Sequence, residues 1–256
     1  MIRSRLTRNQ RKPNWRQVMT GLRRRVAAGD AAAMTEMAIT INDGIRAGDG
    51  RLLVRRNAPY AVRLLKRAIE KGDESAAGPL GYAYDVGQGV RRNNAIAMRW
   101  YRRAVRRGDC CAASNIATVY RDKGDLKQAH SWALRAMEMG DGDDAVTAGY
   151  NYLYGIGVRR NPAKARCVFR RALRQNTTEY GREEALYNLG VERADAGDRK
   201  RAILLLERAN KAGDYPEAAS LLAQLAAKVE LIPCRCRRHL RKGLNGHAPC
   251  LQHTSI

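Results

Sequence analysis

The chain has 256 residues, with 48 Lys or Arg against 25 Asp or Glu, and its formal net charge is +23. No run of 18 apolar residues occurs, which excludes a membrane-spanning helix of ordinary composition. The bases gather at the ends: residues 1–29 hold nine and residues 231–256 hold five, with no acid in either stretch. This charge favours an acidic partner, either an acidic protein surface or nucleic acid, or else it serves only solubility.

The N-terminal segment, residues 1–14, is interpreted as a basic arm. It lacks the apolar stretch of a secretory signal, although an Arg-rich, acid-free start is also typical of an organellar transit peptide. The six cysteines do not recur in register along the chain, which favours a reducing compartment. We therefore expect a cytoplasmic protein, with import into an organelle as the alternative.

A frame of the form Ala-x2-Φ-Φ-x2-Ala-x3-Gly, in which Φ is usually a bulky apolar residue, recurs five times. Its copies begin at Ala61, Ala97, Ala129, Ala165 and Ala202. Successive copies are 36, 32, 36 and 37 residues apart at their last position, a spacing typical of arrays of helix pairs. Such an array buries apolar surface only between neighbouring repeats and serves first as a binding surface.

The second repeat predicts a helical hairpin. Residues 75–86 form one amphipathic helix, Gly87 and Gly89 break it, and Asn93 can cap a second helix that stops at Gly108. Nine Gly-Asp dipeptides also occur along the chain. In several of them we expect the glycine to end a helix in the left-handed region and the aspartate to cap the next helix.

Two repeats depart from the regular turn. Residues 84–93 and 152–161 carry nearly the same turn, whereas residues 120–125 are four residues shorter. Residues 42–57 instead insert a long connection that contains Arg55 and Arg56. Because specific contacts often lie in long turns of repeat arrays, both arginines are candidate partner-binding residues.

The second repeat resembles a Sel1-like repeat, a relative of the tetratricopeptide repeat. The resemblance rests on the pattern Leu80-Gly81-x2-Tyr84-x2-Gly87-x-Gly89-Val90-x2-Asn93-x3-Ala97-x2-Trp100-Tyr101-x2-Ala104-x3-Gly108. It extends over about residues 31–213 and implies an all-α solenoid, a right-handed superhelix of about five hairpins, with residues 215–228 as a capping helix. We therefore assign residues 15–230 to the solenoid. Paired cysteines, found in a secreted branch of the family, are missing.

The resemblance also implies a non-enzymatic adaptor or scaffold that binds a protein through its concave face. Tyr82, Tyr150 and Tyr154 are candidates for that face, with packing inside the hairpins as the alternative. Three other tyrosines occupy the matching consensus position and are expected in the core: Tyr84, Tyr120 and Tyr152. The chain has no phosphate loop, zinc-protease motif or nucleophile elbow, so we expect neither an enzyme nor a small-molecule substrate. His130 is expected at a solvent-facing or groove position without a role.

The basic tail, residues 231–256, holds the only metal-ligand pattern. Two close pairs, Cys234 with Cys236 and Cys250 with His253, supply the four donors of a structural zinc site, and His239 or His247 could replace one of them. The alternatives are a basic tail without metal and a set of redox disulfides. Around a zinc module, basic residues could contact phosphates, which is the alternative function in nucleic-acid binding. These bases are Arg235, Arg237, Arg238, Arg241 and Lys242.

Overall fold

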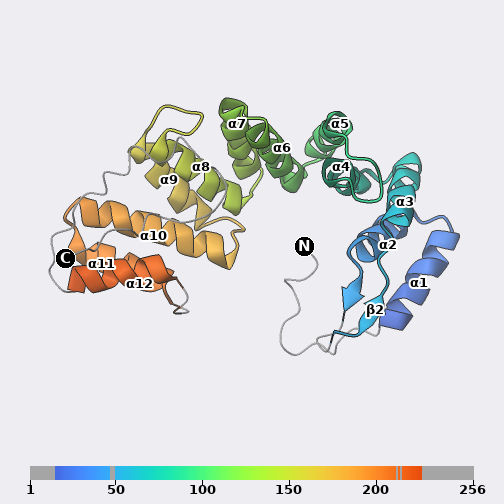
Figure 1. Cartoon of the computed structure of the whole chain (residues 1–256), viewed down its shortest axis with the longest axis horizontal. Coiled ribbons are helices and arrows are strands. Elements are labelled where there is room, and N and C mark those ends of the chain that lie inside the picture. Colours follow the sequence, from blue (N-terminus) through green and yellow to red (C-terminus); the bar gives the residue numbers. More distant parts are fainter. Residues whose placement is uncertain (1–14, 47–49, 212, 214, 227–256) are drawn as a thin grey trace. The chain divides into compact units, whose positions relative to one another are not determined.

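The computed structural model describes residues 15–46, 50–211, 213 and 215–226. They divide between two compact units, with the boundary between Met139 and Gly140. Each unit is built from antiparallel helix pairs (Figure 1), so the prediction of an all-α repeat fold is confirmed. None of the described helices is both long enough and apolar enough to cross a bilayer.

The first unit contains three helix pairs preceded by one further helix. Its elements are α1 (Trp15–Ala27), α2 (Ala31–Asp43), β1 (Ile45–Arg46), β2 (Leu52–Val54), α3 (Ala58–Glu70), the 3₁₀ helix η1 (Glu74–Ala76), α4 (Ala77–Val86), α5 (Asn94–Val105), α6 (Cys110–Asp122) and α7 (Leu126–Glu138). The pairs are α2 with α3, α4 with α5 and α6 with α7. Neighbouring pairs also touch, through α3 with α4 and α5 with α6, so the core continues from one hairpin to the next.

The second unit contains two helix pairs followed by a closing helix. Its elements are α8 (Gly142–Tyr154), α9 (Pro162–Ala172), α10 (Glu179–Asp195), α11 (Arg199–Ala209) and α12 (Pro216–Ala226). Helix α8 packs on α9, α10 packs on α11, and α12 covers α11. This agrees with the expected closing helix after the fifth repeat.

Two elements were not expected from the sequence. Helix α1 packs on α2 through the buried side chains of Met19, Leu22 and Val26, which recur at helical spacing. The long connection between α2 and α3 contains the short antiparallel pair β1 and β2, in which Ile45 pairs with Val54. The side chain of Val54 is buried in the core of the first unit, and this anchors the inserted segment.

The Gly-Asp prediction is confirmed at six dipeptides. In each the glycine has a positive φ and the aspartate accepts a hydrogen bond from a backbone N–H in the first turn of the following helix. These aspartates are Asp30, Asp73, Asp109, Asp125, Asp141 and Asp198. Asp143, in another Gly-Asp dipeptide, lies inside α8 and accepts from the hydroxyl of Thr178 at 2.7 Å.

Close approach of a glycine and a large side chain sets the spacing within three of the pairs. A Cβ placed on Gly81 would lie 2.7 Å from the Tyr101 ring, and one on Gly149 would lie 2.5 Å from the Phe169 ring. In the third pair, α10 with α11, a Cβ on Gly190 would lie 2.8 Å from the Cγ atom of Leu206. Because Tyr101 and Phe169 are almost wholly buried, neither ring has space to move away.

We predict that Gly149→Ala destabilises the fold by about 1–2 kcal/mol, because the cost of overpacking exceeds the gain in helix propensity. Thermal or urea unfolding followed by circular dichroism measures the change. Gly21→Ala in α1 is the control, since apart from the backbone of its own helix and its chain neighbours no atom lies within 4 Å of the added Cβ. That variant should be neutral or stabilising. Equal effects of the two variants would contradict the packing explanation.

Candidate functional site

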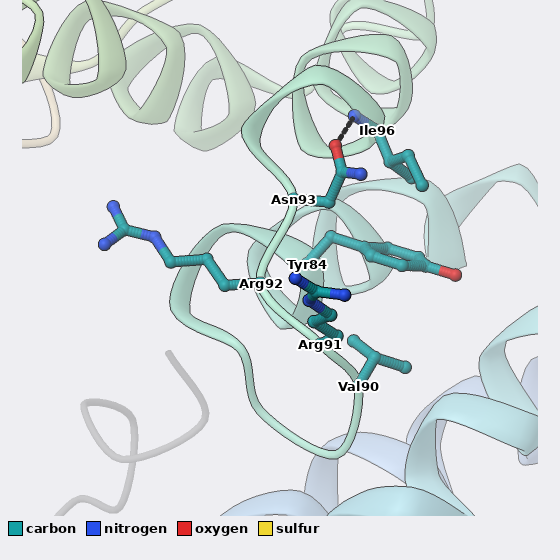
Figure 2. A pocket seen from close by; sticks show the side chains of 6 residues that line it. All are labelled: Tyr84, Val90, Arg91, Arg92, Asn93 and Ile96. Carbon is teal, nitrogen blue, oxygen red and sulfur yellow. Dashed lines mark hydrogen bonds between the residues drawn. The ribbon is translucent and has the colours of Figure 1, made fainter.

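An open pocket of about 470 Å³ lies at the turn between α4 and α5. Its lining comes from the end of α4, from the turn and from the first turn of α5, as Figure 2 shows. The lining residues are Tyr84, Val90, Arg91, Arg92, Asn93 and Ile96. We call this cavity the turn pocket.

The backbone of the turn is fixed by the preceding hairpin. Gly87 ends α4 in the left-handed region at φ 75°. Gly89 comes so close to the start of α3 that a Cβ would lie 2.4 Å from the carbonyl carbon of Ala58, so only glycine fits there. The side-chain Nε2 of Gln88 also donates to the backbone carbonyl oxygen of Asn42, in α2, at 3.2 Å. The turn is therefore held against both helices of the first pair.

The turn pocket combines an apolar interior with positive charge at its edge. In Figure 2 the Tyr84 ring lies between Ile96 and Val90, whereas the side chain of Arg92 extends away from the ring. Arg91 and Arg92 are exposed. The Nζ atom of Lys66, from α3, lies 5.7 Å from the centroid of the Tyr84 ring. No carboxylate lines the pocket.

The nearest acid along the chain is engaged elsewhere. Asp85 follows Tyr84 in α4, and its Oδ2 accepts a hydrogen bond from the hydroxyl of Tyr101 at 3.2 Å. Burial, together with the negative charge of Asp85, raises the pKa of Tyr101. Tyr101 therefore remains a neutral hydrogen-bond donor, and Asp85 is turned towards the hairpin core.

The arginine pair of the turn pocket belongs to a recurring motif. The sequence Arg-Arg-Asn occurs at residues 55–57, 91–93 and 159–161, each time directly before the second helix of a pair. In all three the asparagine side chain caps the helix by accepting a backbone N–H. The expected candidates Arg55 and Arg56 are both exposed at the end of β2. Sequence reasoning missed Arg91 and Arg92, although the repeated motif was a visible signal for them.

The three tyrosine candidates differ in their surroundings. Tyr82 lies on α4 in the first unit and is 44% exposed. In the second unit Tyr150 and Tyr154 stack at 5.8 Å between ring centroids. Tyr150 is half-buried and accepts a hydrogen bond from Asn188 at 3.0 Å, whereas Tyr154 is 49% exposed. Tyr150 thus packs between α8 and α10, while Tyr82 and Tyr154 present ring surface to solvent.

The tyrosines at the consensus position are half-buried, and the expectation that they pack in the core is confirmed for two of them. Tyr84 and Tyr120 pack against the core of the first unit, yet part of each side chain remains exposed. Tyr152 has the same partial exposure, with the Nζ atom of Lys164 5.6 Å from its ring centroid.

A second arrangement in the first unit shows how this chain holds a cation. Arg103 of α5 places its guanidinium carbon 5.4 Å from the centroid of the Trp100 ring. It also donates two hydrogen bonds to the carboxylate of Glu74, at 2.6 and 2.7 Å. These hydrogen bonds lower the pKa of Glu74. The guanidinium is thus held by an aromatic ring and a carboxylate together.

The tail candidates lie outside the described residues. These are the four zinc-ligand candidates Cys234, Cys236, Cys250 and His253, and the five bases Arg235, Arg237, Arg238, Arg241 and Lys242. The zinc site and the nucleic-acid contact therefore stay predictions. The described cysteines, Cys110, Cys111 and Cys167, form no disulfide.

His130 is buried, which corrects the expectation of a solvent-facing or groove position. Its side chain lies in α7 and only 5% of the residue is exposed. Of the neighbours Ala129 and His130, the repeating frame assigns only Ala129 to the buried side of the helix. In the structure His130 is buried as well. Burial lowers the pKa of the His130 imidazole, since the charged form loses hydration there.

Comparison with known families and structures gives consistent results. The Sel1 repeat model matches five segments that together make up more than half of the chain, at residues 31–73, 80–109, 120–141, 148–176 and 183–214. A Sel1 repeat protein from Oxalobacter formigenes is similar in structure, with a TM-score of 0.65 and 22% identity, over 84% of this chain and 85% of that one. No curated protein matches the chain in sequence.

A longer structure shares the same fold. It is c5321, described as a protective antigen of uropathogenic Escherichia coli strains with an SLR fold. The TM-score is 0.66 at 21% identity, and the match covers 81% of this chain. The chain spans only 43% of the length of c5321. At this identity the likeness establishes the fold alone.

We predict that stability falls as the pH drops below about 6.5, because the unfolded histidine takes up a proton that buried His130 resists. The folded-state pKa is the lower one, so the stability is present above the unfolded value and lost on acidification. Urea unfolding at pH 7.5 and pH 5.5 measures this change. His130→Gln should flatten the profile in this window. An unchanged profile in that variant would show that other groups carry the pH dependence.

Proposed function

The chain belongs to the Sel1 repeat family, and from this membership we propose that it is a non-enzymatic scaffold that binds an acidic segment of a partner protein at the turn pocket. Proteins of this repeat class generally serve as protein-interaction scaffolds. One observation carries the finer assignment: the pocket has apolar side chains inside, exposed arginines at its edge and no lining carboxylate.

The turn pocket suits a peptide with an apolar side chain between acidic ones. The apolar residue would contact Tyr84, Val90 and Ile96, where burial of its surface supplies affinity. Carboxylates on either side would meet Arg91 and Arg92, which select for charge and raise the association rate. Arg55 and Arg56 lie just before α3, the helix whose first residue contacts Gly89 of the turn. They would extend the positive surface of the pocket.

We predict that Arg91→Gln/Arg92→Gln weakens binding of a fluorescent peptide, in which one leucine is flanked by glutamates, by about 3- to 30-fold. This range corresponds to the loss of two exposed charge contacts. Fluorescence anisotropy of the full chain measures the affinity, and added salt should weaken binding of the unaltered chain.

The matched control is Arg159→Gln/Arg160→Gln, which changes the same motif at the turn before α9. That variant should retain affinity. Equal losses in both variants would indicate attraction to the whole basic chain and would remove the assignment to the turn pocket. The same would follow if a single-stranded oligonucleotide bound in competition with the peptide and with similar sensitivity to Arg91 and Arg92.

We also propose that the basic tail holds a structural zinc ion through Cys234, Cys236, Cys250 and His253. This rests on the sequence pattern of two close donor pairs. We predict about one zinc per full chain after purification without a histidine tag, and its loss in Cys234→Ser/Cys236→Ser, with metal content measured by mass spectrometry. Cys167→Ser, which changes an exposed thiol on α9, is the control and should leave the zinc content unchanged. Zinc that persists without Cys234 and Cys236 would exclude this site.

A further inference from the structure

The second unit carries a cluster of tyrosines from two helices and from the residue before a third. Tyr150 and Tyr154 come from α8, Tyr180 and Tyr187 from α10, and Tyr215 directly precedes α12. Their rings form contacts in two groups, Tyr150 with Tyr154, and Tyr215 with both Tyr180 and Tyr187. The Tyr187–Tyr215 centroids are 5.5 Å apart and the Tyr180–Tyr215 centroids are 6.4 Å apart. We call these five residues the tyrosine face.

The tyrosine face has a buried base and an exposed edge. Tyr215 is buried and Tyr150 and Tyr187 are half-buried, so three rings are fixed by packing. Tyr180 and Tyr154 are 54% and 49% exposed. An exposed aromatic ring supported by buried ones is a rigid contact surface that loses little conformational entropy on binding.

Carboxylates surround these rings, although the chain as a whole is strongly basic. Burial raises the pKa of Tyr180, and the negative charges of Glu184, Glu217 and Glu183 raise it further. The negative charge of Glu184 also raises the pKa values of Tyr150, Tyr154 and Tyr215, and its side chain is hydrogen-bonded with that of Tyr150. The positive charge of Arg160, by contrast, acts to lower the pKa of Tyr154.

Elsewhere the chain places its own cations over rings of this kind. Arg or Lys side chains lie over five aromatic rings, with centroid distances between 5.2 and 5.7 Å. These rings are Tyr60, Tyr84, Trp100, Trp132 and Tyr152. Within the described part of the chain no such cation lies over the rings of the tyrosine face. That face thus combines exposed rings with nearby carboxylates, the combination that holds Arg103 between Trp100 and Glu74.

We propose that the tyrosine face binds a basic segment of a partner protein, with Arg or Lys side chains stacked on the exposed rings of Tyr180 and Tyr154 and paired with the partly exposed carboxylate of Glu217. Charge complementarity selects this occupant, because the carboxylates repel an acidic segment and the exposed rings attract a guanidinium. The inference goes beyond the turn pocket: it concerns another unit, other residues and a partner of opposite charge.

The test uses the full chain and a fluorescent peptide of alternating arginine and serine, followed by fluorescence anisotropy. We expect saturable binding of the arginine peptide. Binding of the matching lysine peptide should be weaker, since arginine stacks better on aromatic rings. The matching glutamate peptide should not bind at this face. Tyr180→Leu/Glu217→Gln should weaken arginine-peptide binding by about tenfold, the combined effect of losing a stacking contact and a charge contact.

Two matched controls separate this face from general effects. Tyr82→Leu changes an exposed tyrosine of the first unit, and Glu207→Gln changes an exposed acid on α11. Both should bind the arginine peptide like the unaltered chain. Arg91→Gln/Arg92→Gln should also leave this binding intact, so the failure of one proposed surface is distinguishable from the failure of the other. Circular dichroism confirms that every variant is folded.

Three outcomes would overturn the proposal. The first is no saturable binding of the arginine peptide. The second is equal weakening of that binding by Tyr82→Leu and by Tyr180→Leu/Glu217→Gln. The third concerns the bases of the chain's own tail. If the peptide binds only to a full-length variant in which Arg235, Arg237, Arg238, Arg241 and Lys242 are glutamine, the tail itself occupies the face, and the assignment to a separate partner is wrong.

Discussion

The close contact between a glycine on one helix and a large side chain on its partner fixes the distance between the helices in three of the hairpins. In α8 and α9 this contact joins Gly149 to the ring of Phe169, and in α4 and α5 it joins Gly81 to Tyr101. Because the ring occupies the space where a Cβ would be, the two helices approach as closely as their backbones permit. The neighbouring alanines of the recurring frame are buried for the same reason. Side chains outside these contacts do not set the distance between the helices, so they can form binding surfaces.

The two proposed surfaces illustrate this division between scaffold and contact. The turn pocket is made by a connection and by the exposed ends of α4 and α5, while the tyrosine face is made by the sides of α8 and α10 and the start of α12. One carries arginines around an apolar centre, and the other carries glutamates around exposed rings. A scaffold with surfaces of opposite charge can hold two different partner segments, each rejected by the surface that suits the other.

Local sequence rules predicted much of the fold because they act within a few residues. The asparagine at position 93 and the six Gly-Asp aspartates cap the helices that they precede, as a helix start requires. The short β1–β2 pair was missed because its few residues carry no alternating pattern and depend on Val54 reaching a distant core. His130 was misplaced because a shift of one position on a helix changes which side chains face inward. The tyrosine face joins residues up to 65 positions apart, from Tyr150 to Tyr215, and no local pattern links them.

The Arg-Arg-Asn motif separates two tasks that often fall on the same residues. The asparagine is needed by the fold, since it caps α3, α5 and α9. The two preceding positions are exposed in all three copies, so their side chains contribute little to the packed core, although the Nε atom of Arg160 donates to the carbonyl oxygen of Leu153 at 3.0 Å. Mutation can therefore alter the charge displayed at each turn, one repeat at a time, while every helix keeps its start. A duplicated repeat would inherit the cap and could acquire a new specificity through two codons.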